Sequence, residues 1–152
     1  FSDWRFAAVG GISGGSTLIG AEAMKVGELI AYVNAVKGRE FPPEVYDVWL
    51  NEVEGMVQTR IHLVPSESVL PLVRDPDDPT AFGETVLSVP FPYDKLYAPY
   101  IEARAEYAAG DYDGYSNSMA LFEQFFTEYM AHYAQVFRPA DRRKRRALGI
   151  NF

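Results

Sequence analysis

The chain of 152 residues contains no cysteine, which excludes disulfide bonds, thiolate metal ligands and a cysteine nucleophile. It also lacks any apolar run close to the roughly 18 residues that a membrane-spanning helix needs, so we expect no membrane contact. Its first residues show no basic stretch ahead of a continuous apolar one and do not resemble a secretory signal.

Recognisable catalytic and metal-binding patterns are missing as well. The two histidines are His62 and His132, and no Glu-x-x-His pair of the carboxylate-bundle di-iron type occurs. Glu128 precedes His132 by about one helical turn, so these two side chains could lie on one side of a helix. Glu52 and Glu54 are only two residues apart and would point in different directions on a helix, so they are poor candidates for a paired acid and base. We therefore expect no metal, no cofactor and no enzymatic activity.

Two further stretches lack the residues that binding loops require. The acidic sequence DPDDP at 75–79 has neither the alternating ligands nor the glycine of an EF-hand loop. The sequence GGISGG at 10–15 has no following lysine and no strand before it, so it does not predict a phosphate-binding loop.

Aromatic residues, by contrast, are abundant. Ten tyrosines and ten phenylalanines accompany an apolar content of 48%, enough to form the core of one domain. Large amphipathic rings fill cores and also build protein–protein interfaces.

Charge divides the chain into an acidic part and a short basic one. Six bases and one acid give residues 138–152 a charge of +5. Because the net charge of the whole chain is −7, residues 1–137 carry −12. The bases are Arg138, Arg142, Arg143, Lys144, Arg145 and Arg146. Such a tail binds nucleic-acid phosphates, docks on an acidic protein surface or stays solvated. The closing apolar residues, with Ile150 and Phe152, favour insertion into a partner.

Composition predicts three regions along the chain. Residues 1–23 are rich in glycine, alanine and serine and have linker composition; they form either a leader outside the native domain or an arm that lies along a partner. Residues 24–138 form the predicted helical domain, and residues 139–152 form the basic tail.

Helical periodicity begins directly after the leader. Apolar residues from Val26 to Val36 predict a first helix that Gly38 ends. A second helix begins at PPEV, since proline suits the first helical positions, and ends at Pro65. Its apolar stripe is Val45, Val48, Trp49, Val53, Met56, Val57, Ile61 and Val64. Its outer, solvated face is Glu44, Asp47, Asn51, Glu54, Gln58 and Arg60.

Residues 65–92 change character. The sequence ETVLSV at 84–89 predicts one short β-strand, which needs a partner for its backbone groups. We expect that partner to be SVLPLV at 68–73, in a hairpin around the acidic loop, or a strand of another chain.

The C-terminal half predicts a long antiparallel αα-hairpin. One helix spans about 94–109 and the next runs from Asp111 or Asp113 to about Arg138. Gly110 supplies the left-handed residue that ends the first, and an aspartate caps the second. The long helix carries a heptad seam of Tyr112, Tyr115, Met119, Phe122, Phe126, Tyr129, Tyr133 and Val136, typical of side-by-side helices. The expected fold is mainly α: a small helical bundle with this hairpin and one short strand or β-hairpin within 68–90.

Three stretches, in this order, carry a resemblance to a known family. They are MKVGELIAYVN, VWLNEVEGMV and PYDKLYAPYIEARAEYAAGDYDGYSNSMALFEQFF. This pattern, from about Met24 to Tyr133, resembles the small head–tail connector proteins of tailed bacteriophages, also called head-completion or adaptor proteins. The resemblance implies a structural protein of the virion neck, assembled in the host bacterial cytoplasm. Neither the leader nor the basic tail is covered by it.

The resemblance further implies a set of partners. Copies of the chain would form a ring of about twelve subunits beneath the portal protein. The ring would extend the DNA channel without sequence-specific DNA binding, and would be the platform for a neck or tail-completion protein. Two alternatives stay open: a small nucleic-acid-binding regulatory protein that uses the basic tail, and a small enzyme with a polar pocket around Glu128 and His132.

Overall fold

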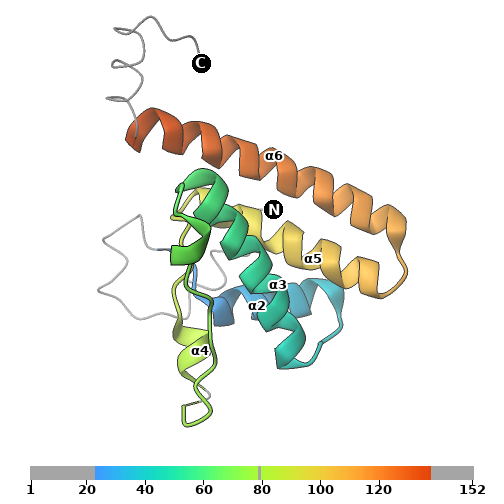
Figure 1. The fold of residues 1–152 in the computed structure, drawn as a ribbon. Coiled ribbons are helices and arrows are strands. Elements are labelled where there is room, and N and C mark those ends of the chain that lie inside the picture. Colours follow the sequence, from blue (N-terminus) through green and yellow to red (C-terminus); the bar gives the residue numbers. More distant parts are fainter. Residues whose placement is uncertain (1–22, 79, 138–152) are drawn as a thin grey trace, which may run out of the picture.

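Helix α2 opens the part of the chain that the structure, a computed structural model, describes, namely residues 23–78 and 80–137 (Figure 1). It spans Val26–Lys37 and ends at Gly38, whose φ of 63° lies in the left-handed region that glycine adopts without strain. The Gly38 N–H donates to the Asn34 carbonyl at 2.9 Å. The first predicted helix and its glycine stop are therefore confirmed. Met24, just before it, is buried in the core.

Helix α3 spans Pro43–Met56, with proline at its first position as predicted. A π-helical turn, Val57–Ile61, continues it, and the chain then turns at Leu63, whose φ is 57°. The helical part thus stops short of the predicted end at Pro65. The prediction that Val48 belongs to the buried stripe of this helix is wrong, since this side chain is 57% exposed.

The predicted strand pairs differently from our expectation. Residues 68–73 form no strand, and residues 84–89 make only an isolated antiparallel bridge, between Val86 and Lys25. The Val26 N–H donates to the Thr85 carbonyl at 2.9 Å, and the Leu87 N–H to the Met24 carbonyl at 2.8 Å. The partner is therefore the segment just before α2. The expected hairpin with 68–73 is wrong, because those residues lie over α3 instead. Short helical turns, Ser66–Ser68 and α4 (Ala81–Glu84), interrupt the region.

Helices α5 and α6 form the C-terminal half and lie side by side (Figure 1). A 3₁₀ turn, Tyr93–Leu96, leads into α5, which spans Tyr97–Ala108. Helix α6 spans Tyr112–Phe137, in agreement with the predicted ends. At 1.5 Å per residue it is about 39 Å long.

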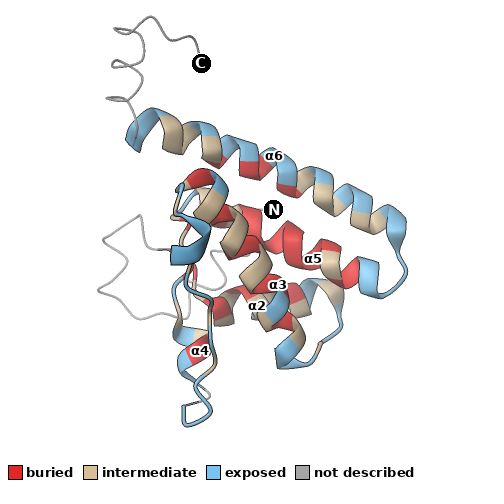
Figure 2. Ribbon diagram, viewed as in Figure 1, coloured by how far each residue is buried: buried red, intermediate tan, exposed pale blue. Residues whose placement is uncertain are grey.

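Helix α5 is the centre of the molecule. It contacts α2, α3 and α6, and Figure 2 shows it buried along most of its length while α6 keeps an exposed outer face. A helix surrounded in this way needs small residues where neighbours approach; Ala98, Ala103 and Ala105 meet this need and are buried. The helical bundle that the sequence predicts is the observed fold.

Candidate functional site

The turn between α5 and α6 is built from polar contacts. Gly110 has a φ of 80°, and the Asp111 Oδ1 accepts the Gly114 N–H at 2.9 Å, capping α6. The Ser118 hydroxyl donates to Glu106, whose carboxylate is also paired with Lys37 at 3.4 Å. Gly110 and Asp111 thus act as predicted, and the turn ties α2, α5 and α6 together.

Tyrosine rings cover the outside of this turn. The Tyr107 ring lies 5.4 Å from Tyr112 and 5.3 Å from Tyr115, between centroids. Tyr107 is 53% exposed and Tyr112 61% exposed. We call these three residues the corner patch.

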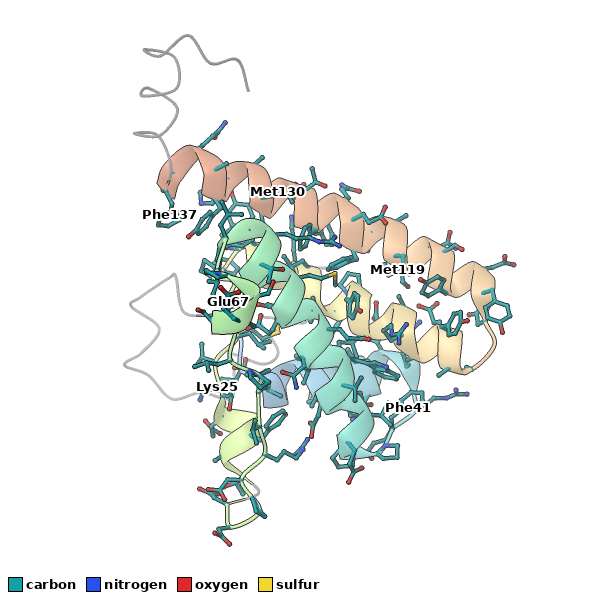
Figure 3. The ribbon with its side chains drawn as sticks, viewed as in Figure 1. Lys25, Phe41, Glu67, Met119, Met130 and Phe137 are labelled. Atoms are coloured by element: carbon teal, nitrogen blue, oxygen red, sulfur yellow. The ribbon has the colours of Figure 1, made fainter. Side chains whose placement is uncertain are left out.

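The predicted seam of α6 is buried only over its middle. Its buried members are Phe122, Phe126 and Tyr129, and its half-buried members are Tyr115, Met119 and Tyr133. Figure 3 shows Met119 on the side of α6 that faces α5. The seam's two ends, Tyr112 and Val136, are exposed, although the Tyr112 ring still contacts Tyr107 of α5 across the hairpin.

Heptad spacing also missed a core residue. Phe125 is buried, and the Lys95 Nζ lies 4.6 Å from its ring centroid, a cation–π contact. Its position next to Phe126 falls outside a strict heptad, but a globular helix buries a wider stripe than a coiled coil does. That wider stripe is the signal that could have found it.

The far end of α6 carries a second aromatic group. The His62 Nε2 and the Tyr129 hydroxyl oxygen are 2.7 Å apart, and the Tyr133 ring lies 4.7 Å from His62 and 4.6 Å from Phe137. Phe137 and Leu63 are mostly exposed, and Figure 3 places Phe137 at the end of α6. We call Leu63, Tyr133, Val136 and Phe137 the end patch.

Burial changes the pKa values in this region. Burial, with smaller effects of the neighbouring Tyr133 and Glu54, raises the pKa of Tyr129 to about 12. Burial also lowers the pKa of His62, although Glu54 acts in the opposite direction. A neutral His62 that accepts a hydrogen bond from the Tyr129 hydroxyl agrees with both shifts.

A shallow groove of about 540 Å³ contains Glu128 and His132. The Glu128 carboxylate is paired with the Lys95 ammonium at 3.1 Å, and the His132 ring stacks on Tyr93 with centroids 4.4 Å apart. Both candidate groups of the enzyme hypothesis thus face one groove and both contact a neighbouring side chain. That hypothesis stays a prediction.

Glu54 on α3 is a buried carboxylate that the sequence pattern places on the solvated face. Glu54 is 7% exposed rather than solvated. Its Oε2 accepts the Ser88 hydroxyl at 2.7 Å and the Ser88 N–H at 3.2 Å, and its Oε1 accepts the Tyr97 hydroxyl. Burial, together with the Glu54 charge and hydrogen bond, raises the pKa of Tyr97 well above its ordinary value. The neutral phenol therefore persists as a donor.

Two other residues of the predicted outer face of α3, Asp47 and Asn51, are also partly covered, whereas Glu44 and Arg60 are exposed as predicted. The Asp47 carboxylate is paired with Arg74 at 2.7 Å. The Asn51 side chain exchanges two hydrogen bonds, of 2.7 and 3.0 Å, with the backbone of Leu72. These polar residues stabilise segment 69–74 on α3: the Asn51 amide satisfies backbone groups that have no sheet partner, and the Asp47 carboxylate holds the Arg74 side chain.

The predicted docking residues of the basic tail, from Arg138 to Phe152, lie outside the described residues, as do residues 1–22 of the predicted leader 1–23. Within the described part, no group of three or more histidine, aspartate or glutamate side chains is arranged to hold a metal ion. No described helix is long and apolar enough to cross a membrane.

Comparison with known proteins gives no relative: no family model, curated protein or solved structure matches the chain significantly. The resemblance to connector proteins therefore rests on the sequence pattern alone.

Proposed function

We propose that the protein is a head–tail connector of a tailed bacteriophage, which forms a ring beneath the portal and provides a docking platform for neck or tail proteins. The observation that carries this proposal is the position of the corner patch and the end patch. They lie at opposite ends of α6, and their outermost members, Tyr112 and Phe137, are about 38 Å apart along its axis.

A closed ring needs two different surfaces on each subunit, because each copy contacts one neighbour with one surface and the other neighbour with the second. Exposed aromatic residues suit such contacts, since they are enriched at interfaces. Tyr112 is 61% exposed in one patch and Phe137 is 62% exposed in the other. Residues 1–137 carry −12, and an acidic channel wall repels the DNA that must slide past it.

The test is electron microscopy of the full chain mixed with the portal protein of its own phage. We expect an additional ring of density on the portal. Variants Tyr112→Glu and Phe137→Glu place a charge in one patch each, at exposed positions, and are expected to abolish that ring. Val73→Glu, exposed on segment 69–74, is the matched control and is expected to retain it. A portal that stays bare with the wild-type chain would overturn the proposal.

A further inference from the structure

A groove of about 420 Å³ lies between α3 and the two extended segments that cover it. On the α3 side its lining is polar and includes Asn51, Glu54 and Gln58, whereas Leu70 and Val86 contribute apolar surface from the covering segments. Leu70 is 86% exposed. Val86, which lines the same groove, is 54% exposed, and exposed apolar side chains gathered along one groove mark an interaction site.

The backbone beside this groove has an open edge. Thr85 and Leu87 use their backbone groups to pair with the segment before α2. In an extended chain successive backbone groups point to opposite sides, so the N–H and C=O of Val86 point away from that segment. Among the described residues neither group has a hydrogen-bond partner. An extended peptide in the groove can therefore add as a strand, the mode of recognition known as β-augmentation.

The chain itself contains a segment with the matching pattern. Residues 147–152 read ALGINF, in which Leu148, Ile150 and Phe152 recur at every second position. In a strand these three side chains lie on one face. That face is complementary to the apolar wall formed by Leu70 and Val86.

The end of α6 lies close enough to deliver this segment. The Tyr133 ring contacts His62 at 4.7 Å between centroids, and Ser66, four residues after His62, lines the groove. The 15 residues from 138 to 152 span up to about 50 Å when extended. The distance from the end of α6 into the groove is therefore within their reach.

Charge favours the same placement. The stretch 138–146 holds all six bases of the tail, and exposed carboxylates flank the covering segment: Glu67 beside Ser66, and Asp75, Asp77 and Asp78 after it. Attraction between the bases of the tail and these carboxylates of the body increases the local concentration of the tail at the groove.

We propose that residues 147–152 occupy this groove of their own molecule as an added strand beside Val86, with the basic stretch 138–146 lying along the exposed carboxylates. The tail then covers an apolar face of the body and its own apolar residues at once. A partner that binds the same tail residues then competes with the groove for them. This inference does not depend on the connector function.

The test uses the full chain with Asn151→Cys, which carries a nitroxide spin label. The chain has no other cysteine, and residue 151 lies on the opposite face of the proposed strand from Ile150. In a methyl-labelled sample we expect strong broadening of the Leu70 and Val86 resonances and their recovery on reduction of the label. Unchanged resonances would overturn the proposal.

A mixed sample separates docking within one molecule from exchange between copies. Spin-labelled chains without isotopes are combined with methyl-labelled chains without the spin label. No broadening is expected in this sample. Broadening there, as strong as in the doubly labelled chain, would overturn docking within one molecule and assign the groove to a second copy.

Variants on the two sides of the contact complete the design. Leu70→Asp in the groove and Ile150→Asp in the tail are each expected to remove the broadening at Val86. The second change alters none of the described residues 23–78 and 80–137, so a loss of broadening that it causes does not come from a changed groove. Val36→Asp, an exposed position on α2, is the matched control. Broadening that survives both groove and tail variants would contradict the proposal.

Discussion

A carboxylate in the core is tolerated only when its oxygens are hydrogen-bonded, because an unpaired buried charge is strongly destabilising. Glu54 meets this condition through Ser88 and Tyr97. The Tyr97 hydroxyl in turn accepts the Val89 N–H at 3.0 Å. One phenol therefore joins α3, α5 and the segment before the 3₁₀ turn.

Tyr97→Phe removes that hydroxyl while keeping the ring. It leaves one Glu54 oxygen and the Val89 N–H without a partner in the core, so we expect a loss of about 1–3 kcal/mol in unfolding free energy. Urea unfolding followed by circular dichroism measures this loss. Tyr112→Phe, at an exposed ring, is the control and should change stability by less than about 0.5 kcal/mol. Equal effects of both variants would contradict the role of the network.

His62 makes the stability depend on pH. Its pKa in the folded protein is lowered from 6.5, so the unfolded chain binds a proton at a higher pH than the folded one. The stabilising contribution is thus complete above about pH 6.5 and is lost as the pH falls from there through the lowered pKa. Protonation also removes the acceptor of the Tyr129 hydroxyl.

The measurement is the unfolding free energy between about pH 7.5 and 5, for the wild type and for His62→Gln. Other groups titrate in both proteins, so the difference between the two curves isolates His62. We expect the wild type to lose more stability than the variant on acidification. Parallel curves would show that the His62 environment does not change on folding.

At the level of elements, the turn between α5 and α6 depends on a residue without a side chain. A Cβ at Gly114 would overlap the carboxylates of Glu106 and Asp111. The Asp111 carboxylate caps α6, and the Glu106 carboxylate accepts the Ser118 hydroxyl. Gly114→Ala is therefore expected to destabilise by about 1–2 kcal/mol, the usual cost of losing a helix cap. This loss would outweigh the better helix propensity of alanine.

Gly55→Ala is the matched control for this prediction. Gly55 is also helical, and a Cβ there meets nothing within 4 Å. Alanine should stabilise the protein at that position by about 0.5–1 kcal/mol. Thermal unfolding of the two variants should therefore shift in opposite directions. A shift of both in the same direction would mean that the clash at Gly114 is relieved by movement of the carboxylates.

Local signals in the sequence were enough to predict the helices. Gly38 and Gly110 end two of them and Pro43 begins another, because backbone geometry at those positions is decided by the residue itself. Local signals did not predict which segments of the chain pack against each face of a helix. Glu54 reads as a surface residue by periodicity, and only the chain folding back over α3 makes it buried. The pairing of Val86 with Lys25 joins residues 61 positions apart, for which no local pattern exists.

At the level of the whole molecule, α5 is buried along most of its length by packing within the subunit, whereas α6 is not. Helix α6 buries its middle against α5 and leaves the aromatic residues at both ends exposed. The heptad seam predicted from sequence is thus longer than the contact it makes inside one subunit. The two unused ends, the corner patch and the end patch, are the surfaces that a ring contact would bury.

If the corner patch of one subunit meets the end patch of the next, two damaged variants should rescue one contact when mixed. Tyr112→Glu retains its end patch and Phe137→Glu retains its corner patch, so one intact contact can form between them but cannot be repeated. On the portal we expect cross-linked pairs from the mixture, and neither pairs from each variant alone nor the larger assemblies of the wild type. Gel electrophoresis after cross-linking measures this. If like patches instead met each other, each variant alone would still form pairs through its intact patch, and that result would rule out a head-to-tail ring.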